Sequence, residues 1–291
     1  MLDAGVIQES SSDWAAPPVL IRKRDGSVRW CIDYRALNDV TIKDVYPLPL
    51  VDECLDTLAG SVWFSKLDAN SAYWQIKIRE KDRKKTAFIT KYGLYEHVRM
   101  GFGLCNAPAT YARVMGLVLR GLTWKTCLAF LDDILVLGSS FEDHLSHLKE
   151  IFERFRHHGL KLKPKKCSLF QKEVEFLGRI VTHNSLSMSP NDIKKVENWP
   201  IPRNSKDVEI FMGLANYHRD FIKNFNNIAE PLYQVVGKRK FQWEIEQQLA
   251  FEDLKFALTN PPVLALPNLH DEFILDTDAA FPLNPNSEII V

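Results

Sequence analysis

An acidic pair inside an apolar hairpin is the feature that most constrains how this chain can fold. Residues 125–138 carry strand-forming apolar side chains on both sides of Asp132 and Asp133. The pattern predicts a strand, a tight turn and a second strand, with both carboxylates at the tip. Two adjacent carboxylates destabilise such a hairpin by repulsion unless a cation compensates. The pair is therefore either an ordinary turn or part of a site for two divalent ions, which are held ~3.5–4 Å apart in such sites.

A second acidic position, Asp68, closes an apolar run that includes Trp63, Phe64 and Leu67. A polar turn follows it, and then Tyr73. A lone Asp at the end of a strand is more often a cap than a metal ligand. The surrounding sequence decides between these readings.

Several blocks in a fixed order resemble the reverse transcriptase of gypsy-class long-terminal-repeat retrotransposons, within the retroviral polymerase superfamily. The blocks are residues 15–26, 31–38, 46–49, 64–68, 101–110, 130–133, 175–178, 198–200, 211–217 and 277–279. The resemblance implies an α+β fold of the right-hand polymerase type, with fingers, a palm built on an antiparallel sheet backed by helices, and a helical thumb. It places fingers and palm in residues 1–186, the thumb in 187–262, and a connection with a truncated ribonuclease H-like start in 263–291.

The resemblance also assigns roles to individual residues. Asp68, Asp132 and Asp133 take the positions of the catalytic carboxylates that hold two Mg²⁺ ions. The residues expected to bind the incoming nucleotide are Lys23, Arg29, Ala69, Tyr73 and Phe102. Among these, Lys23 and Arg29 would contact the triphosphate, and Tyr73 would exclude a 2′-hydroxyl. The turn that grips the primer would be formed by Phe176, Leu177 and Gly178, and Asp278 matches the first metal ligand of a ribonuclease H domain.

The chain also departs from the resembling family without losing a metal ligand. Phe130 stands where Tyr is usual, Ala72 where Gly is usual, and Gly101 where Pro is usual. Ala72 and Gly101 border the expected nucleotide pocket, so these changes bear on efficiency rather than on the chemistry.

Charge alone argues weakly against a nucleic-acid partner. Lysine and arginine total 37, as do aspartate and glutamate, so the formal net charge is +0. Two segments, 77–85 and 154–166, are nevertheless basic and suit a phosphate backbone, although each could also be a solvated face. The expected partners are an RNA or DNA template with its primer and a deoxynucleoside triphosphate.

Cysteine and histidine positions carry little chemistry. The five cysteines form no CxxC pair and indicate reduced core residues of an intracellular protein. His144 and His147 are expected on the surface of a helix. No signal peptide and no run of about 18 apolar residues is present, so the sequence predicts neither secretion nor a membrane span.

Local signals predict where the main elements begin and end. Strands are expected at 19–24 and 28–33, and helices at 50–58, from 106–108 onward, from Ser140 to Gly159, at 189–199, after Ser205 and at 247–258. The buried stripe of the helix after Ser140 is expected to consist of Leu145, Leu148, Phe152 and Phe155.

Two functions follow from these observations. The first is an RNA-directed DNA polymerase without ribonuclease H activity, because Asp278 alone cannot complete a two-metal site. The second is a catalytically decayed remnant that at most binds nucleic acid. The abrupt ends of the sequence predict a fragment of a longer polyprotein or a decayed element.

Overall fold

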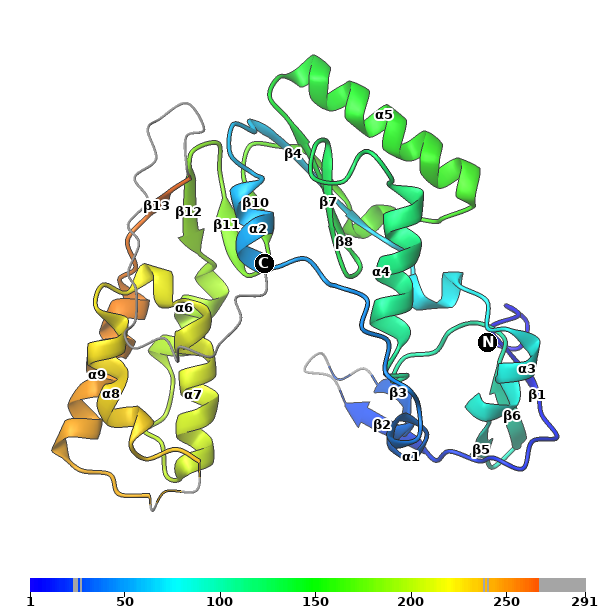
Figure 1. Cartoon of the computed structure of the whole chain (residues 1–291), viewed down its shortest axis with the longest axis horizontal. Coiled ribbons are helices and arrows are strands. Elements are labelled where there is room, and N and C mark those ends of the chain that lie inside the picture. Colours follow the sequence, from blue (N-terminus) through cyan, green and yellow to red (C-terminus); the bar gives the residue numbers. More distant parts are fainter. Residues whose placement is uncertain (23–25, 27, 238, 240, 267–291) are drawn as a thin grey trace, which may run out of the picture.

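The computed structural model describes the chain from Met1 to Leu266, apart from residues 23–25, 27, 238 and 240. Lys23 and Asp278 lie outside the described residues, and Arg29 is described only as the backbone of a strand. Figure 1 shows a central sheet covered by helices, with two masses that extend from it on either side. The mass on the right consists of small sheets from the N-terminal part, and the mass on the left is mainly a bundle of helices. The predicted α+β polymerase fold is confirmed.

The central sheet is antiparallel, with the strand order β7-β8-β4-β9. Its strands are β4 (Trp63–Asp68), β7 (Cys127–Phe130), β8 (Asp133–Gly138) and β9 (Ser168–Gln171). Side chains of β8 alternate between two cores: Ile134 and Val136 lie on one face, Leu135 and Leu137 on the other. The strand reads as a continuous apolar run because both faces are covered, and this rigid support positions its first residue, Asp133.

Helices cover one face of this sheet and a mixed layer covers the other. The first face packs against α4 (Ala107–Val118) and α5 (Phe141–His158), through residues such as Tyr111, Met115 and Ile151. The second face packs against α2 (Val51–Asp56) and the strand β10 (Val174–Phe176). The hairpin that contains Phe176 is thereby attached to the same sheet that carries the acidic residues.

Helix α5 begins and ends where the sequence predicts. The Ser140 hydroxyl accepts a hydrogen bond from the backbone N–H of Asp143 at 3.1 Å, and Gly159 closes the helix with φ 69°. The predicted buried stripe is partly wrong, because Leu145 is 51% exposed. The buried stripe instead runs through His144, Leu148, Ile151 and Phe155, one position earlier at its start.

The N-terminal mass contains two separate small sheets. One has the order β1-β6-β5, with β1 (Ile7–Glu9), β6 (Gly93–His97) and β5 (Phe88–Thr90); the other is the hairpin of β2 (Pro18–Arg22) and β3 (Val28–Ile32). Short helices α1 (Arg35–Asp39) and α3 (Glu80–Arg83) complete it. The two strands of the hairpin match the expected ones over the described residues, and β3 ends one residue earlier than predicted.

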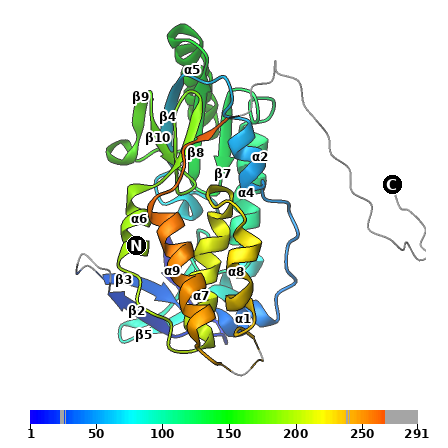
Figure 2. The same cartoon turned by 90° about the vertical axis from the view of Figure 1, so that its left-hand side faces the viewer.

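A second four-stranded sheet links the central sheet to the helical bundle, as the turned view in Figure 2 shows. Its order is β10-β11-β12-β13, with β11 (Arg179–Val181), β12 (Ser185–Met188) and β13 (Leu264–Ala265). The bundle consists of α6 (Pro190–Glu197), α7 (Ser205–Tyr217), α8 (Phe225–Tyr233) and α9 (Ile245–Thr259) around its own apolar core. The predicted domain boundaries at 186 and 262 remain a prediction.

The cysteines and the lengths of the helices bear on two further expectations from the sequence. Of the five cysteines, Cys54 and Cys127 are buried, whereas the others are only partly buried, and all five are free thiols. Within the described part of the chain, no helix has the length and apolarity needed to cross a membrane.

Candidate active site

Strand pairing brings the acidic residues together although they are far apart in sequence. In the antiparallel pair β4–β8, Asp68 lies directly opposite Asp133, where Cα atoms are typically about 4.5–5.5 Å apart. Asp132 occupies the turn between β7 and β8, next to Leu131, whose φ of 54° is left-handed. All three carboxylates line one pocket of about 560 Å³. The structure therefore assembles the predicted acidic set at the ends of two neighbouring strands.

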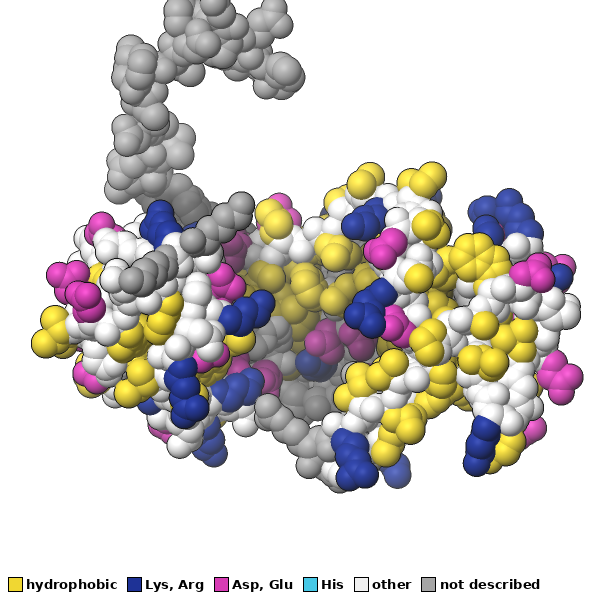
Figure 3. Space-filling model, turned by 90° about the horizontal axis from the view of Figure 1, so that it is seen from below, with side chains coloured by type: hydrophobic (Ala, Val, Ile, Leu, Met, Phe, Trp, Pro, Cys, Tyr) yellow, Lys and Arg dark blue, Asp and Glu magenta, His cyan; other side chains and the backbone are white. Residues whose placement is uncertain are grey.

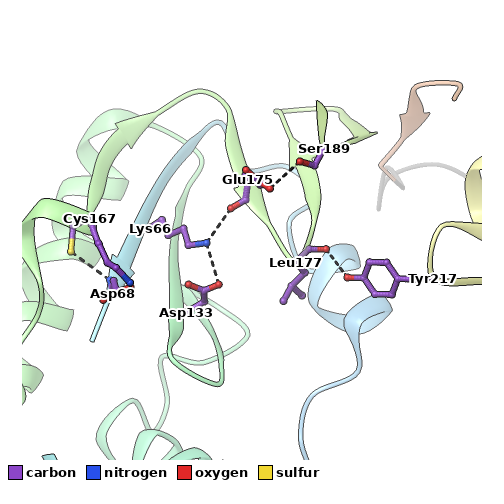
Figure 4. A network of polar contacts seen from close by, with 9 residues as sticks. Lys66, Asp68, Asp133, Cys167, Glu175, Leu177, Ser189 and Tyr217 are labelled. Carbon is purple, nitrogen blue, oxygen red and sulfur yellow. Dashed lines mark hydrogen bonds and ion pairs between the residues drawn. The ribbon is translucent and has the colours of Figure 1, made fainter. Parts of the chain in front are cut away.

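Two lysines compensate this negative charge. The Lys166 ammonium lies 2.9 Å from Asp68 Oδ2. The Lys66 ammonium lies 3.1 Å from Asp133 Oδ2 (Figure 4). The hydrogen bond to Asp68 raises the pKa of Lys166. Sequence reasoning did not single out these lysines. A signal existed for Lys66, because it lies two residues before Asp68 on one strand and so shares its face.

The acidic site has the ligand chemistry for divalent cations, although its carboxylates are not gathered around one point. Among the residues that the structure describes, no three His, Cys, Asp or Glu side chains lie close enough to hold a metal ion as they stand. The cations that contact Asp68 and Asp133 are the two lysine ammonium groups. Lys166 is 58% exposed and free to rotate into solvent. Three carboxylates on fixed strand ends supply the hard oxygen ligands that Mg²⁺ prefers, so the residues present fit this ion.

A second pocket of about 420 Å³ adjoins the acidic residues and is lined by three of the five predicted nucleotide contacts, Ala69, Tyr73 and Phe102. Its lining comprises Asp68, the segment 69–73, Phe102, Asp132, Lys163 and Lys166. The Tyr73 ring lies 5.1 Å from that of Phe102 and 5.8 Å from that of the buried Tyr111. Burial raises the pKa of Tyr73, and the charge of Asp132 acts in the same direction. Tyr73 is thus a neutral, laterally supported wall beside the carboxylates.

One departure from the resembling family has a steric explanation here. A Cβ atom on Gly101 would lie 2.9 Å from Nε2 of the buried His97. Proline carries a Cβ as well as a ring, so the usual residue would collide with this imidazole. Gly101 and His97 therefore form a sterically matched pair next to Phe102, which lines the second pocket.

The predicted primer turn joins β10 to β11. Leu177 and Gly178 form its corner with φ 49° and 66°, the left-handed pair typical of a tight hairpin. Phe176 is completely buried in the core shared with β4 and β8. The Leu177 carbonyl accepts a hydrogen bond of 2.6 Å from the hydroxyl of Tyr217 (Figure 4). The turn is consequently held by both the central sheet and the helical bundle.

Comparison with known proteins identifies the family of the chain. The sequence profile described as reverse transcriptase (RNA-dependent DNA polymerase) matches residues 21–181. The chain belongs to the reverse transcriptase family. It is similar to the retrovirus-related Pol polyprotein from transposon 297 of Drosophila melanogaster, with 41% identity over 287 residues, 96% of this chain and 27% of that polyprotein. The transposon Tf2-3 polyprotein of Schizosaccharomyces pombe is 32% identical over 280 residues, 96% of this chain and 21% of the polyprotein.

Solved structures give the same family. The foamy viral protease–reverse transcriptase in complex with dsDNA superposes with a TM-score of 0.83 at 25% identity, covering 92% of this chain and 57% of that one. The same viral protein in complex with an RNA/DNA hybrid gives a TM-score of 0.79 at 25% identity, covering 89% of this chain and 35% of that one. The reverse transcriptase chain described here spans about a quarter of the length of the curated polyproteins that it matches. The predicted resemblance to retrotransposon reverse transcriptases is confirmed at this level.

The expectation that His144 is a surface residue of this reverse transcriptase is wrong. Its side chain is fully buried, and its Nε2 lies 2.6 Å from the Ser65 hydroxyl, which also accepts a hydrogen bond of 3.0 Å from the Phe170 N–H. Burial lowers the pKa of His144. The neutral imidazole therefore ties α5 to β4 and β9 beneath the acidic site. His147 lies nearer solvent and donates to the Leu137 carbonyl at 2.7 Å.

Proposed function

We propose that this chain is the polymerase part of a gypsy-class retrotransposon Pol polyprotein and extends a primer 3′-hydroxyl with deoxynucleoside triphosphates on an RNA or DNA template. The observation that carries the proposal is the pairing of Asp68 with Asp133, with Asp132 in the same pocket. Foamy viral relatives in complex with dsDNA and with an RNA/DNA hybrid support a duplex as the partner. Asp278 remains a sequence-based assignment to a ribonuclease H-like segment.

Asp68, Asp132 and Asp133 would together hold two Mg²⁺ ions. When bound, such ions stabilise the charge that develops on the transferring phosphoryl group and its attacking and leaving oxygens. Lys163 and Lys166, which line the adjoining pocket, supply positive charge where the triphosphate would lie. Arg29 and Lys23 are proposed to contact the triphosphate from the fingers, on the basis of the sequence.

The second pocket accounts for substrate choice in this proposal. The backbone from Ala69 to Ala72 follows the triphosphate, and Phe102 packs near the base and sugar. Tyr73 stands between the carboxylates and two aromatic neighbours, so its ring has little freedom to move away. An added 2′-hydroxyl would meet this fixed ring, which selects against ribonucleotides by repulsion.

The distribution of charged side chains on the surface is consistent with a duplex bound in the space between the two masses. Figure 3 shows acidic side chains deep in the hollow between them and Lys and Arg side chains around its opening. Phosphate contacts by such cations supply most of the affinity for a nucleic-acid backbone. Fingers and palm within 1–186 and the thumb within 187–262 would then lie on either side of the duplex.

Primer extension on an RNA template with Mg²⁺ tests the proposal, with Asp132→Asn as the variant. Extension in a single turnover should fall at least about a hundredfold, since metal-ion catalysis contributes several kcal/mol and each 1.36 kcal/mol is tenfold in rate. Duplex affinity should stay within about twofold, because it comes mainly from phosphate contacts.

Asp253→Asn on α9 is a matched control, because it makes the same chemical change at an exposed position of the helical bundle. It should leave both quantities at the parental values. Equal extension rates for Asp132→Asn and the parent would refute the metal-site assignment. A parent that binds the duplex but does not extend the primer would instead indicate a decayed element.

A further inference from the structure

The hairpin β10–β11 connects the acidic site to the helical bundle through a series of polar contacts (Figure 4). On the palm side, Lys66 contacts Asp133 at 3.1 Å and donates to the Glu175 carbonyl at 3.4 Å. On the other side, the Glu175 carboxylate accepts a hydrogen bond of 3.0 Å from the Ser189 hydroxyl, at the start of α6. A movement of the hairpin would therefore change its contacts both with the acidic site and with the start of α6.

The corner of the hairpin rests on α7. The hydroxyl of Tyr217, the last residue of that helix, donates to the Leu177 carbonyl at 2.6 Å. A Cβ atom on Gly178 would lie 3.6 Å from Cε1 of Tyr217 and 3.4 Å from Oδ2 of Asp192. The Tyr217 ring thus lies where a side chain at position 178 would touch it, and its hydroxyl makes a hydrogen bond to the corner.

Tyr217 is itself held in place. Arg179, 3% exposed, directs its guanidinium to the Tyr217 carbonyl at 3.4 Å and to the Asp220 carboxylate at 3.0 Å. The same guanidinium lies 6.0 Å from the centre of the Tyr217 ring. Burial raises the pKa of Tyr217, so the hydroxyl remains a donor throughout the neutral range. An oriented donor of this kind costs little further ordering when the primer binds.

We propose that Tyr217 is a positioning residue for the primer terminus, acting through the Leu177 carbonyl to fix the primer-grip turn relative to the acidic residues. The inference rests on the proposed function, since it takes Phe176, Leu177 and Gly178 as the residues that hold the primer. The hydroxyl makes the turn move with α7, so the helical bundle sets where the primer 3′-end lies. Loss of the hydroxyl alone frees the turn while leaving the ring against Gly178.

The test is Tyr217→Phe, with Tyr233→Phe as the matched control on α8, where the tyrosine is 42% exposed. The first readout is the fluorescence of 2-aminopurine at the primer 3′-end in the complex with template–primer duplex, without nucleotide. Tyr217→Phe should change this signal while the Kd for the duplex stays within about twofold of the parent. Tyr233→Phe should leave both unchanged.

The second readout is single-turnover extension. For Tyr217→Phe the rate at saturating nucleotide should fall about fivefold, the effect of one lost hydrogen bond, with the nucleotide concentration at half-maximal rate unchanged. A purely structural role predicts a lower urea midpoint with parental fluorescence and rate, and that result would overturn the inference. The fluorescence readout needs no chemistry, so a parent that binds but does not extend refutes the polymerase proposal separately.

Discussion

Gly138 at the end of β8 offers a sharp test of how tightly the acidic strand is packed against α5. A Cβ atom built on Gly138 would lie 2.5 Å from His144 Cβ, 2.7 Å from its Cα and 2.9 Å from its backbone nitrogen. These atoms belong to or adjoin the helix backbone, so no side-chain rotation can relieve the contact. Gly138→Ala must push the first turn of α5 away from the strand.

The sign of the effect follows from two opposing contributions. Overpacking of this kind costs about 1–3 kcal/mol, whereas replacing Gly by Ala favours folding by about 0.4–1 kcal/mol through the unfolded state. We therefore expect a net loss of about 1–2 kcal/mol in the free energy of unfolding. Displacement of α5 would also weaken the contact between His144 and Ser65, which supports β4.

Gly213→Ala is the matched control, since the same chemical change is made at an exposed position within α7. No atom lies within 4 Å of the added Cβ there, and alanine favours a helix interior over glycine by about 1 kcal/mol. Urea denaturation followed by circular dichroism should move the midpoint down for Gly138→Ala and up for Gly213→Ala. A Gly138→Ala midpoint at or above that of the parent would refute the packing argument.

Two further predictions concern the nucleotide pocket and the dependence of stability on pH. Tyr73→Ala should raise ribonucleotide incorporation relative to deoxynucleotide incorporation by about tenfold or more, because the repulsive ring is lost; competing-substrate extension measures this ratio, and an unchanged ratio removes Tyr73 from sugar selection. Burial lowers the pKa of His97 to about 4, from 6.5, so between these pH values the unfolded chain binds more protons at this residue. The free energy of unfolding should therefore fall as pH drops from 6.5 to 4, with His97 contributing up to about 3 kcal/mol. His97→Phe should flatten the urea midpoint over this range, and a midpoint curve as steep as that of the parent would exclude His97 as a cause.

The parts of the fold that sequence patterns predicted are those fixed by local signals. The acidic hairpin follows from apolar runs around two turn residues, and its expected strands match β7 and β8. Helix α5 follows from a capping Ser140 and a closing Gly159. These signals act over a few residues, so no knowledge of distant contacts was needed.

The same reasoning failed where tertiary packing overrides local preference. His144 was expected on the surface because no second pair of metal ligands accompanies His144 and His147, but Gly138 leaves room for its main chain and Ser65 satisfies its Nε2. Leu145 was expected in the core, but its side chain is exposed because His144 lies on the buried face of the helix instead. Gly138 and Ser65 both lie outside α5, so the periodicity of that helix gives no sign of their contacts with His144.

Helix α8 and the strands β10–β13 escaped prediction for different physical reasons. Helix α8 contains Pro231, which argues against a helix interior, and it begins after Asn224 with φ 59°. The strands are only two to four residues long and depend on pairing between distant segments, as where Leu186 meets Leu264. The resemblance assigned the primer turn to residues 176–178, and that assignment stays a prediction; the hydrogen bond that attaches this turn to Tyr217 could emerge only from the assembled structure.

The zero net charge of the chain is compatible with a nucleic-acid partner because part of its basic charge is paired with carboxylates at the site. Asp68 and Asp133 are paired with Lys166 and Lys66 at the site, so part of the basic total neutralises carboxylates there. When cations take over those carboxylates, the same ammonium groups become available to phosphate oxygens in the adjoining pocket, whose lining already includes Lys163. Metal binding and triphosphate binding would then favour each other. The metal would replace the lysines at the carboxylates, and the triphosphate would pair with the ammonium groups that are released.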